Sequence, residues 1–123
     1  MKFYISSRTK KANQTKEIIQ KLKSLGHSIT FNWTKQANLK PYNKNLEQSA
    51  IFSKRVISAI KNCNSFILLT DQAGAGMHTE LGVAIAEKKK IFIIGKHSNT
   101  NVFFFHPNIK RLNSINNLFK EIT

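Results

Sequence analysis

The sequence is poor in acidic residues, cysteine and proline. Only six of its 123 residues are Asp or Glu, against twenty Lys or Arg, and the formal net charge is +14. The single cysteine, Cys63, excludes an internal disulfide and agrees with a reducing compartment. No apolar run approaches the roughly 20 residues that a transmembrane helix needs. The N-terminus turns polar after one short apolar segment, so we expect no signal peptide and a cytoplasmic location.

The excess of positive charge favours an anionic partner without indicating nucleic acid. The lysines are spread along the whole chain, and the clusters at 10–11 and 88–90 are short. Proteins that read base edges depend on arginine, and this chain has only three arginines. Richness in Asn and Ile also suggests a coding bias towards Lys and Asn. We therefore expect attraction of phosphorylated small molecules, and we disfavour a nucleic-acid partner.

Short apolar runs alternate with helical repeats along the chain. The runs predict strands at 2–6, 28–33, 65–70 and 90–95, with a short edge strand at 109–112. The repeats predict helices at 12–25, 46–62, 77–87 and 114–122, and leave loops at 34–44 and 96–108. This order predicts one domain, residues 1–123, of the α/β class, with a parallel sheet of four to five strands between helices. Ligands of such sheets bind beyond the carboxyl ends of the strands.

Two of the six acidic residues bracket a glycine-rich turn, Asp71-Gln-Ala-Gly-Ala-Gly-Met-His-Thr-Glu80. Gly74 and Gly76 allow a sharp turn and leave space for a ligand. A helix that begins at about Met77 places Glu80 in its first turn, where the helix dipole favours a carboxylate by about 0.3 to 1 kcal/mol. We therefore expect an ionised Glu80 that can act as a nucleophile, although acidic residues are common in first helical turns without any catalytic role.

Other polar and aromatic residues lie at the same predicted edge of the sheet. Ser6, Ser7 and Arg8 follow the first strand and suit a phosphate, or form a solvated turn with a capping serine. His78 is a candidate to bind sugar or base, or a plain surface group. Trp33, Phe103 and Phe104 are candidates to stack on a base, or pack in the core or against a partner subunit. No residue has metal-ligand spacing with His78, so we expect neither a metal nor a cofactor.

The pattern Gly-x-Gly-x-x-x-Glu-Leu-Gly-x-Ala-x-Ala after an apolar strand resembles the nucleoside 2-deoxyribosyltransferase family and the related 2′-deoxynucleoside 5′-phosphate N-hydrolases. The resemblance covers most of the chain and implies a flavodoxin-like three-layer sandwich, a homo-oligomer and cleavage of an N-glycosidic bond. Glu80 matches the family's catalytic glutamate, Tyr4 the tyrosine that orients it, and Asp71 falls near an acidic position that contacts the base. The hydrolases bind a 5′-phosphate in the region of Ser6, Ser7 and Arg8.

The residue types agree with that chemistry. A carboxylate can attack C1′ of deoxyribose and form a covalent glycosyl-enzyme as the base departs, through an oxocarbenium-like state. A second base or water then completes the reaction on a nucleoside or nucleotide substrate. Asp71, protonated or hydrogen-bonded to the base, would assist the leaving group, or it is an Asx-type turn residue at the end of a strand. The alternatives are a TIR-like NAD hydrolase, a non-catalytic nucleotide-binding module and a nucleic-acid binder driven by charge. The chain departs from the family by lacking glycines in the first turn and acidic residues in the 34–44 loop.

Overall fold

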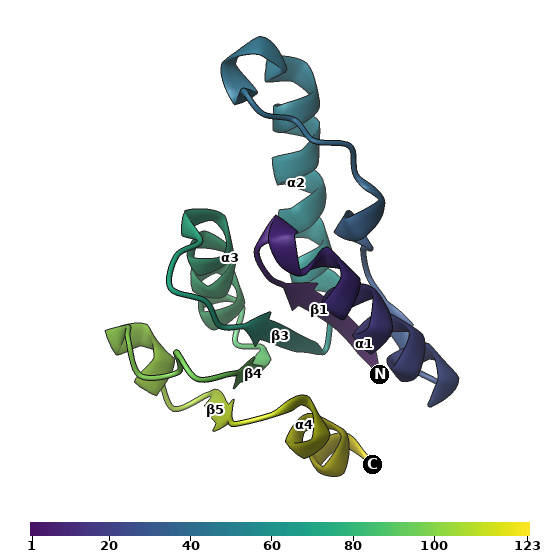
Figure 1. The fold of residues 1–123 in the computed structure, drawn as a ribbon, viewed down its shortest axis with the longest axis vertical. Coiled ribbons are helices and arrows are strands. Elements are labelled where there is room, and N and C mark those ends of the chain that lie inside the picture. Colours follow the sequence, from purple (N-terminus) through teal and green to yellow (C-terminus); the bar gives the residue numbers. More distant parts are fainter.

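The computed structural model describes residues 1–123 as three layers, with one parallel sheet between two pairs of helices (Figure 1). The strands are β1 (Lys2–Ser6), β2 (Ser28–Ile29), β3 (Ser65–Leu69), β4 (Lys90–Ile94) and β5 (Ile109–Leu112). The helices are α1 (Ala12–Ser24), α2 (Leu46–Asn62), α3 (Ala75–Ala86) and α4 (Ile115–Ile122). The strand order β2-β1-β3-β4-β5 is that of flavodoxin-like folds, so the predicted fold class is confirmed.

Alternate residues of the central strands face opposite layers because side chains in a strand have a period of two. One face packs against α2 and α3, and its buried strand residues are Tyr4, Phe66, Leu68, Ile91 and Ile93. The other face packs against α1 and α4, and its buried strand residues are Phe3, Ile5, Ile67, Leu69, Phe92, Ile94 and Leu112. Every residue of β3 is buried, as its unbroken apolar sequence predicts for a central strand covered on both faces.

The order of the strands brings the ends of β1 and β3 together. The two strands are in register from Phe3 opposite Ser65 to Ser6 opposite Leu68. The segment after Ser6 and the glycine-rich turn after β3 therefore start at the same edge of the sheet. The chain turns to opposite sides of the sheet after β1 and after β3, which opens a crevice at this switch point.

The sequence predicted most elements to within two residues, and the second strand is the main error. It ends at Ile29, whereas the alternating pattern predicted a strand to residue 33. The indole N–H of Trp33 donates to the carbonyl of Ile5 at 2.7 Å, so a side chain takes the place of a further strand–strand hydrogen bond. Phe31 packs edge-on against Phe52 of α2, at the border of the core on that face of the sheet. The polar segment that follows also contains two short 3-10 turns, Trp33–Lys35 and Tyr42–Lys44.

The amino-terminal half of α2, with the turn before it, projects beyond the sheet (Figure 1). This helix carries exposed Leu46, Ile51 and Ile57, whereas Val56, Ala59 and Ile60 are buried in its second half. None of the helices has the length and the apolar content needed to cross a bilayer.

Candidate active site

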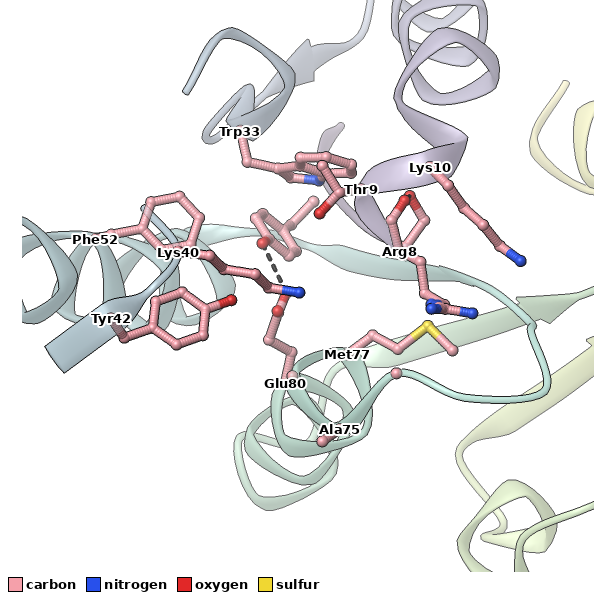
Figure 2. A pocket seen from close by; sticks show the side chains of 14 residues that line it. Arg8, Thr9, Lys10, Trp33, Lys40, Tyr42, Phe52, Ala75, Met77 and Glu80 are labelled. Atoms are coloured by element: carbon pink, nitrogen blue, oxygen red, sulfur yellow. Dashed lines mark hydrogen bonds between the residues drawn. The ribbon is translucent and has the colours of Figure 1, made fainter. Parts of the chain in front are cut away.

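A cavity of about 640 Å³ opens at the carboxyl end of β1. Its walls come from the start of α1, the segment after β2, one side of α2 and the first turns of α3 (Figure 2). The lining residues are Tyr4, Ser7, Arg8, Thr9, Lys10, Trp33, Lys40, Tyr42, Phe52, Gly74, Ala75, Gly76, Met77 and Glu80. Seven of the ten residues predicted for the site are therefore on its walls: Tyr4, Ser7, Arg8, Trp33, Gly74, Gly76 and Glu80.

Tyr4 and Glu80 are joined inside this cavity. The Tyr4 hydroxyl donates a hydrogen bond of 2.7 Å to Oε1 of Glu80 (Figure 2). Tyr4 is 1% exposed and its ring stacks near Phe66, so the hydroxyl has no freedom to turn towards bulk solvent. The bond therefore holds the carboxylate in one orientation, and no hydrogen bond from the protein reaches Oε2.

Burial raises the pKa of the Glu80 carboxyl, and the hydroxyls of Tyr4 and Ser6 lower it without cancelling the effect of burial. The Ser6 hydroxyl is buried and makes no hydrogen bond within the protein, so it affects Glu80 as a nearby dipole. Burial, followed by the negative charge of Glu80, raises the pKa of Tyr4 well above its usual value. Tyr4 thus remains a proton donor in this pair, and Glu80 is an unusually basic carboxylate.

The predicted reason for the ionisation of Glu80 is wrong. Helix α3 begins at Ala75, two residues earlier than the predicted start at Met77, so Glu80 lies in the second turn. The field of a helix dipole falls off within the first turn. The hydroxyls of Tyr4 and Ser6, rather than the helix terminus, are the groups that favour the charged form of Glu80.

The two glycines of the turn have different roles. Gly74 precedes α3 with φ +123°, a conformation that side chains disfavour. A Cβ atom on Gly74 would lie 3.0 Å from Cε of Met77 and 3.2 Å from Cγ of Arg8. A Cβ atom on Gly76 would meet nothing within 4 Å. Gly74 is therefore needed for the backbone and for close packing, and Gly76 alone leaves open space in the cavity.

The turn after β1 presents Arg8 and Ser7 to the cavity but not Ser6. Ser6 is 1% exposed and lies outside the lining, below the wall. Ser7 Oγ lies 2.9 Å from Oγ1 of Thr15 and 3.4 Å from the carbonyl oxygen of Arg8, so it serves the turn itself. Arg8 and Lys10 are the charged groups that this turn supplies to the cavity.

Asp71 is buried outside the cavity, among three cations. Its Oδ2 lies 3.4 Å from Nζ of Lys10 and 3.8 Å from Nζ of Lys11, and its Oδ1 lies 3.6 Å from Nη1 of Arg8. Desolvation raises the pKa of Asp71, but the hydrogen bond from the Gln72 N–H and the charge of Lys10 outweigh it, and the pKa lies below its usual value. Asp71 is thus a counter-ion to these cations and is not among the residues that line the cavity, and its lowered pKa disfavours the protonated form of the predicted role.

His78 also lies outside the cavity lining. Its Nδ1 is 2.8 Å from the carbonyl oxygen of Gly74, and its ring stacks on Phe104 at 5.7 Å between centroids. Phe104 is buried in the core beside α3, and Phe103 is exposed away from the cavity. Of the aromatic residues predicted to stack on a base, only Trp33 reaches the cavity.

Sequence reasoning missed the wall formed by Lys40, Tyr42 and Phe52. Lys40 and Tyr42 belong to the polar segment after β2, and Figure 2 shows both side chains pointing into the cavity. Segments that follow the strands of a parallel sheet gather at its carboxyl edge, so the position of this loop was a usable signal. Phe52 belongs to the apolar pattern of the 46–62 helix, and the spacing of that pattern does not distinguish a core residue from a cavity residue. No group of three His, Cys, Asp or Glu side chains could hold a metal ion.

The cavity walls carry more positive than negative charge. Arg8, Lys10 and Lys40 line it, and Glu80 is the only carboxylate among the lining residues. Apolar surface comes from Trp33 and Phe52, together with Tyr42 and Met77. Such a cavity suits a ligand with a flat apolar part and an anionic part.

Comparison with known proteins identifies the family. The nucleoside 2-deoxyribosyltransferase family matches residues 4–114, and the chain belongs to that family of enzymes. The CMP N-glycosidase of Clostridium botulinum has a similar structure, with a TM-score of 0.67 and 17% identity over 99% of this chain and 98% of that chain. The 2-deoxyribosyltransferase of Bacillus psychrosaccharolyticus is also similar, with a TM-score of 0.67 and 14% identity over 98% of this chain and 90% of that chain.

At these identities the likeness to the two structures concerns the fold. No protein of curated function matches the sequence. The predicted family and the predicted class, a nucleoside deoxyribosyltransferase or N-glycosidase, are confirmed by the family match.

Proposed function

We propose that this enzyme cleaves the N-glycosidic bond of a deoxynucleoside or its 5′-monophosphate, with Glu80 as the nucleophile. The hydrogen bond between Tyr4 and Glu80 on the cavity wall is the observation that carries the proposal. It leaves one carboxylate oxygen held and the other available to a sugar. The raised pKa of Glu80 increases the nucleophilicity of its ionised form, and the Tyr4 hydroxyl keeps that form accessible.

In the first step Oε2 of Glu80 attacks C1′ of the deoxyribose. The C1′–O bond forms as the C1′–N bond breaks, and the electron pair of that bond leaves with the base, which takes up a proton from solvent. In the second step water or another base attacks C1′, releases the Glu80 carboxylate and loses one proton. Tyr4 stabilises the carboxylate when it departs, because its hydroxyl is already directed at Oε1.

The charges of the cavity support a phosphorylated substrate. Arg8 and Lys10 lie on one wall, and Lys40 reaches in from the segment after β2 (Figure 2). Arginine and lysine side chains recognise a phosphate through charge-assisted hydrogen bonds. Trp33 supplies the flat surface on which a base can stack. Both similar enzymes bear names for reactions at an N-glycosidic bond, one a glycosidase and one a transferase, so water and a second base are both candidate acceptors.

The test is release of free base. The protein is incubated with the four deoxynucleosides, their 5′-monophosphates, CMP and NAD, each with and without an acceptor base, and the products are separated chromatographically. Glu80→Ala is expected to lower the rate by about a thousand-fold or more, as loss of a nucleophile does in other enzymes. The matched control is Glu87→Ala, which removes a carboxylate at the exposed end of the same helix.

Full base release by Glu80→Ala would show that Glu80 is not the nucleophile. Cleavage of NAD alone would contradict the proposal and would indicate an NAD hydrolase. If no compound is cleaved and a nucleotide still raises the unfolding temperature, the chain is a binding module.

We also propose that the chain forms a homo-oligomer. Exposed apolar side chains gather on two segments, Leu46, Ile51 and Ile57 on α2 and Val102, Phe103 and Phe105 on the turn before β5. The projecting part of α2 leaves Leu46 and Ile51 exposed (Figure 1). Analytical ultracentrifugation at micromolar concentration is expected to give a multiple of the 14.0 kDa chain mass. Leu46→Glu should reduce that mass, and a monomeric wild-type protein would refute the proposal.

A further inference from the structure

A second cavity lies at the same edge of the sheet, and the proposed reaction does not use it. Its volume is about 290 Å³, and no apolar side chain lines it. The walls come from the start of α1, the end of β3 and the turn after β4, with lining residues Lys10, Lys11, Thr70, Asp71, Gln72, Gly95, Lys96 and His97. Because the lining is entirely polar, a small apolar occupant is excluded and a charged or strongly polar occupant is favoured.

The walls of this cavity are held in place by Thr70. Its N–H and its hydroxyl both donate to the carbonyl of Ile94, at 2.8 and 3.0 Å, and the N–H of His97 donates to its Oγ1 at 3.4 Å. Gly95 has φ +126°, and a Cβ atom there would collide with Oγ1 of Thr70. Glycine at this position therefore lets the 95–97 turn close onto the end of β3, which gives the cavity a preformed wall.

Positive charge exceeds negative charge around the second cavity. Lys10, Lys11 and Lys96 line it, and Asp71 is the only carboxylate among its walls. The Lys11 ammonium is anchored, since it donates to the Thr70 carbonyl at 2.6 Å and lies 3.8 Å from Asp71 Oδ2. One buried carboxylate cannot neutralise three ammonium groups, so an anion gains favourable interactions here.

We propose that the second cavity is a phosphoryl-binding site formed by Lys10, Lys11 and Lys96. Lys10 lines both cavities, so a phosphoryl group can come from either of two sources. The first source is the distal phosphates of a nucleoside di- or triphosphate whose sugar lies beside Glu80, and this source rests on the proposed function. The second source is free inorganic phosphate or pyrophosphate, which binds independently of any reaction at Glu80.

The experiment measures binding rather than turnover. Isothermal titration at constant ionic strength compares the four common deoxynucleoside 5′-monophosphates, the matching triphosphates, inorganic phosphate and pyrophosphate, all on Glu80→Gln protein to prevent cleavage. The test variants are Lys96→Ala and Lys96→Glu, whose side chain is exposed and can be changed without disturbing the core. The matched control is Lys23→Glu, which reverses an exposed charge near the far end of α1.

If the distal phosphates occupy the site, a triphosphate binds about ten-fold tighter than its monophosphate, as one added charge-assisted contact provides. Lys96→Glu then removes this advantage and leaves the monophosphate affinity unchanged. If free anions occupy it, pyrophosphate binds the parent protein and loses about ten-fold in affinity in Lys96→Glu, whereas triphosphate and monophosphate bind alike.

The proposal is overturned if neither preference exists, or if Lys23→Glu weakens binding as much as Lys96→Glu. Because titration does not require turnover, the binding result can be interpreted even if the protein releases no base in the Glu80 assay.

Discussion

The hydroxyl of Tyr4 and Oε1 of Glu80 lie 2.7 Å apart, which links the first strand to the third helix across 76 positions of sequence. The two side chains depend on each other. Without the carboxylate, a hydroxyl on a 1% exposed tyrosine would be buried without a partner. Without the hydroxyl, the carboxylate would lose the nearest group that favours its charge. The pair therefore sets both the direction and the basicity of the proposed nucleophile.

Tyr4→Phe is expected to lower kcat and to move the acid side of the pH profile upwards. A hydrogen bond to a charged group contributes about 1.5 to 3 kcal/mol, so kcat should fall by roughly 10- to 100-fold. The Tyr4 hydroxyl lowers the pKa of Glu80, and its removal should raise the pH at which activity is lost in acid. The measurement is base release across the pH range. A lower kcat with an unmoved acid side would mean that Tyr4 only supports the fold.

Glu80→Gln is expected to stabilise the protein at neutral pH. The glutamine amide can still accept the Tyr4 hydrogen bond, and it removes a charge whose burial is unfavourable. Residues that serve a reaction commonly reduce stability in this way. The expected gain is about 1 kcal/mol, equivalent to a rise of roughly 3 to 5 °C in unfolding temperature for a chain of this size.

The stability gain expected for Glu80→Gln should depend on pH. The native pKa of Glu80 is raised above its usual value of 4.5, so between these two values the native state binds more protons than the unfolded state. The stability of the wild-type protein therefore falls as pH rises through that window. The advantage of Glu80→Gln should be full above the native pKa and should disappear below the usual value. Thermal unfolding of both proteins over a pH series measures this, and an advantage that persists unchanged in acid would contradict the assigned cause.

Asp71→Asn is expected to weaken substrate binding without changing the chemical step. The carboxylate holds the cations Arg8 and Lys10, which line the cavity, but it does not reach the cavity itself. Groups within one charged network couple by about 0.5 to 3 kcal/mol, and a coupling of about 1 kcal/mol should raise KM for a 5′-monophosphate by roughly five-fold with little change in kcat. A large loss of kcat would instead assign Asp71 a direct part in the reaction.

The same substitution tests stability in acid. The pKa of Asp71 lies below its usual value of 3.8, so its charge stabilises the fold above that value and the contribution is lost as pH falls through the native pKa. Asp71→Asn should therefore unfold at a lower temperature than wild type at neutral pH, and the difference should shrink in strong acid. Glu121→Gln is the matched control, because its ion pair with Lys110 is exposed and should contribute little.

Periodicity and apolar runs predicted the sheet, its helices and the edge at which the site lies, because those features depend on local spacing. The length of β2 was not predictable in this way, since it depends on a Trp33 side chain reaching Ile5 from another segment. The surroundings of Asp71 were not predictable for the same kind of reason. The resemblance to a family suggested contact with the base, whereas in space three cations from the start of α1 surround the carboxylate. Glu80 and Tyr4 were predictable as a pair only through the resemblance to a family.

The glycine turn provides a prediction in which two similar substitutions should have opposite effects. Gly74→Ala places a Cβ atom at φ +123° and within 3.0 Å of Met77 Cε, so it should destabilise the protein by about 1 to 3 kcal/mol. Gly76→Ala lies inside α3 and meets nothing within 4 Å, so it should stabilise the helix by up to about 1 kcal/mol.

Activity separates the two glycines further. The methyl group of Gly76→Ala would enter the cavity and occupy space that we assign to the substrate, so KM should rise although the protein becomes more stable. Denaturant unfolding and the kinetics of base release measure the two effects on the same preparations. An unchanged KM in Gly76→Ala would place the sugar and base away from the first turn of α3. Equal destabilisation by both substitutions would show that the strained backbone at Gly74 is not what the turn requires.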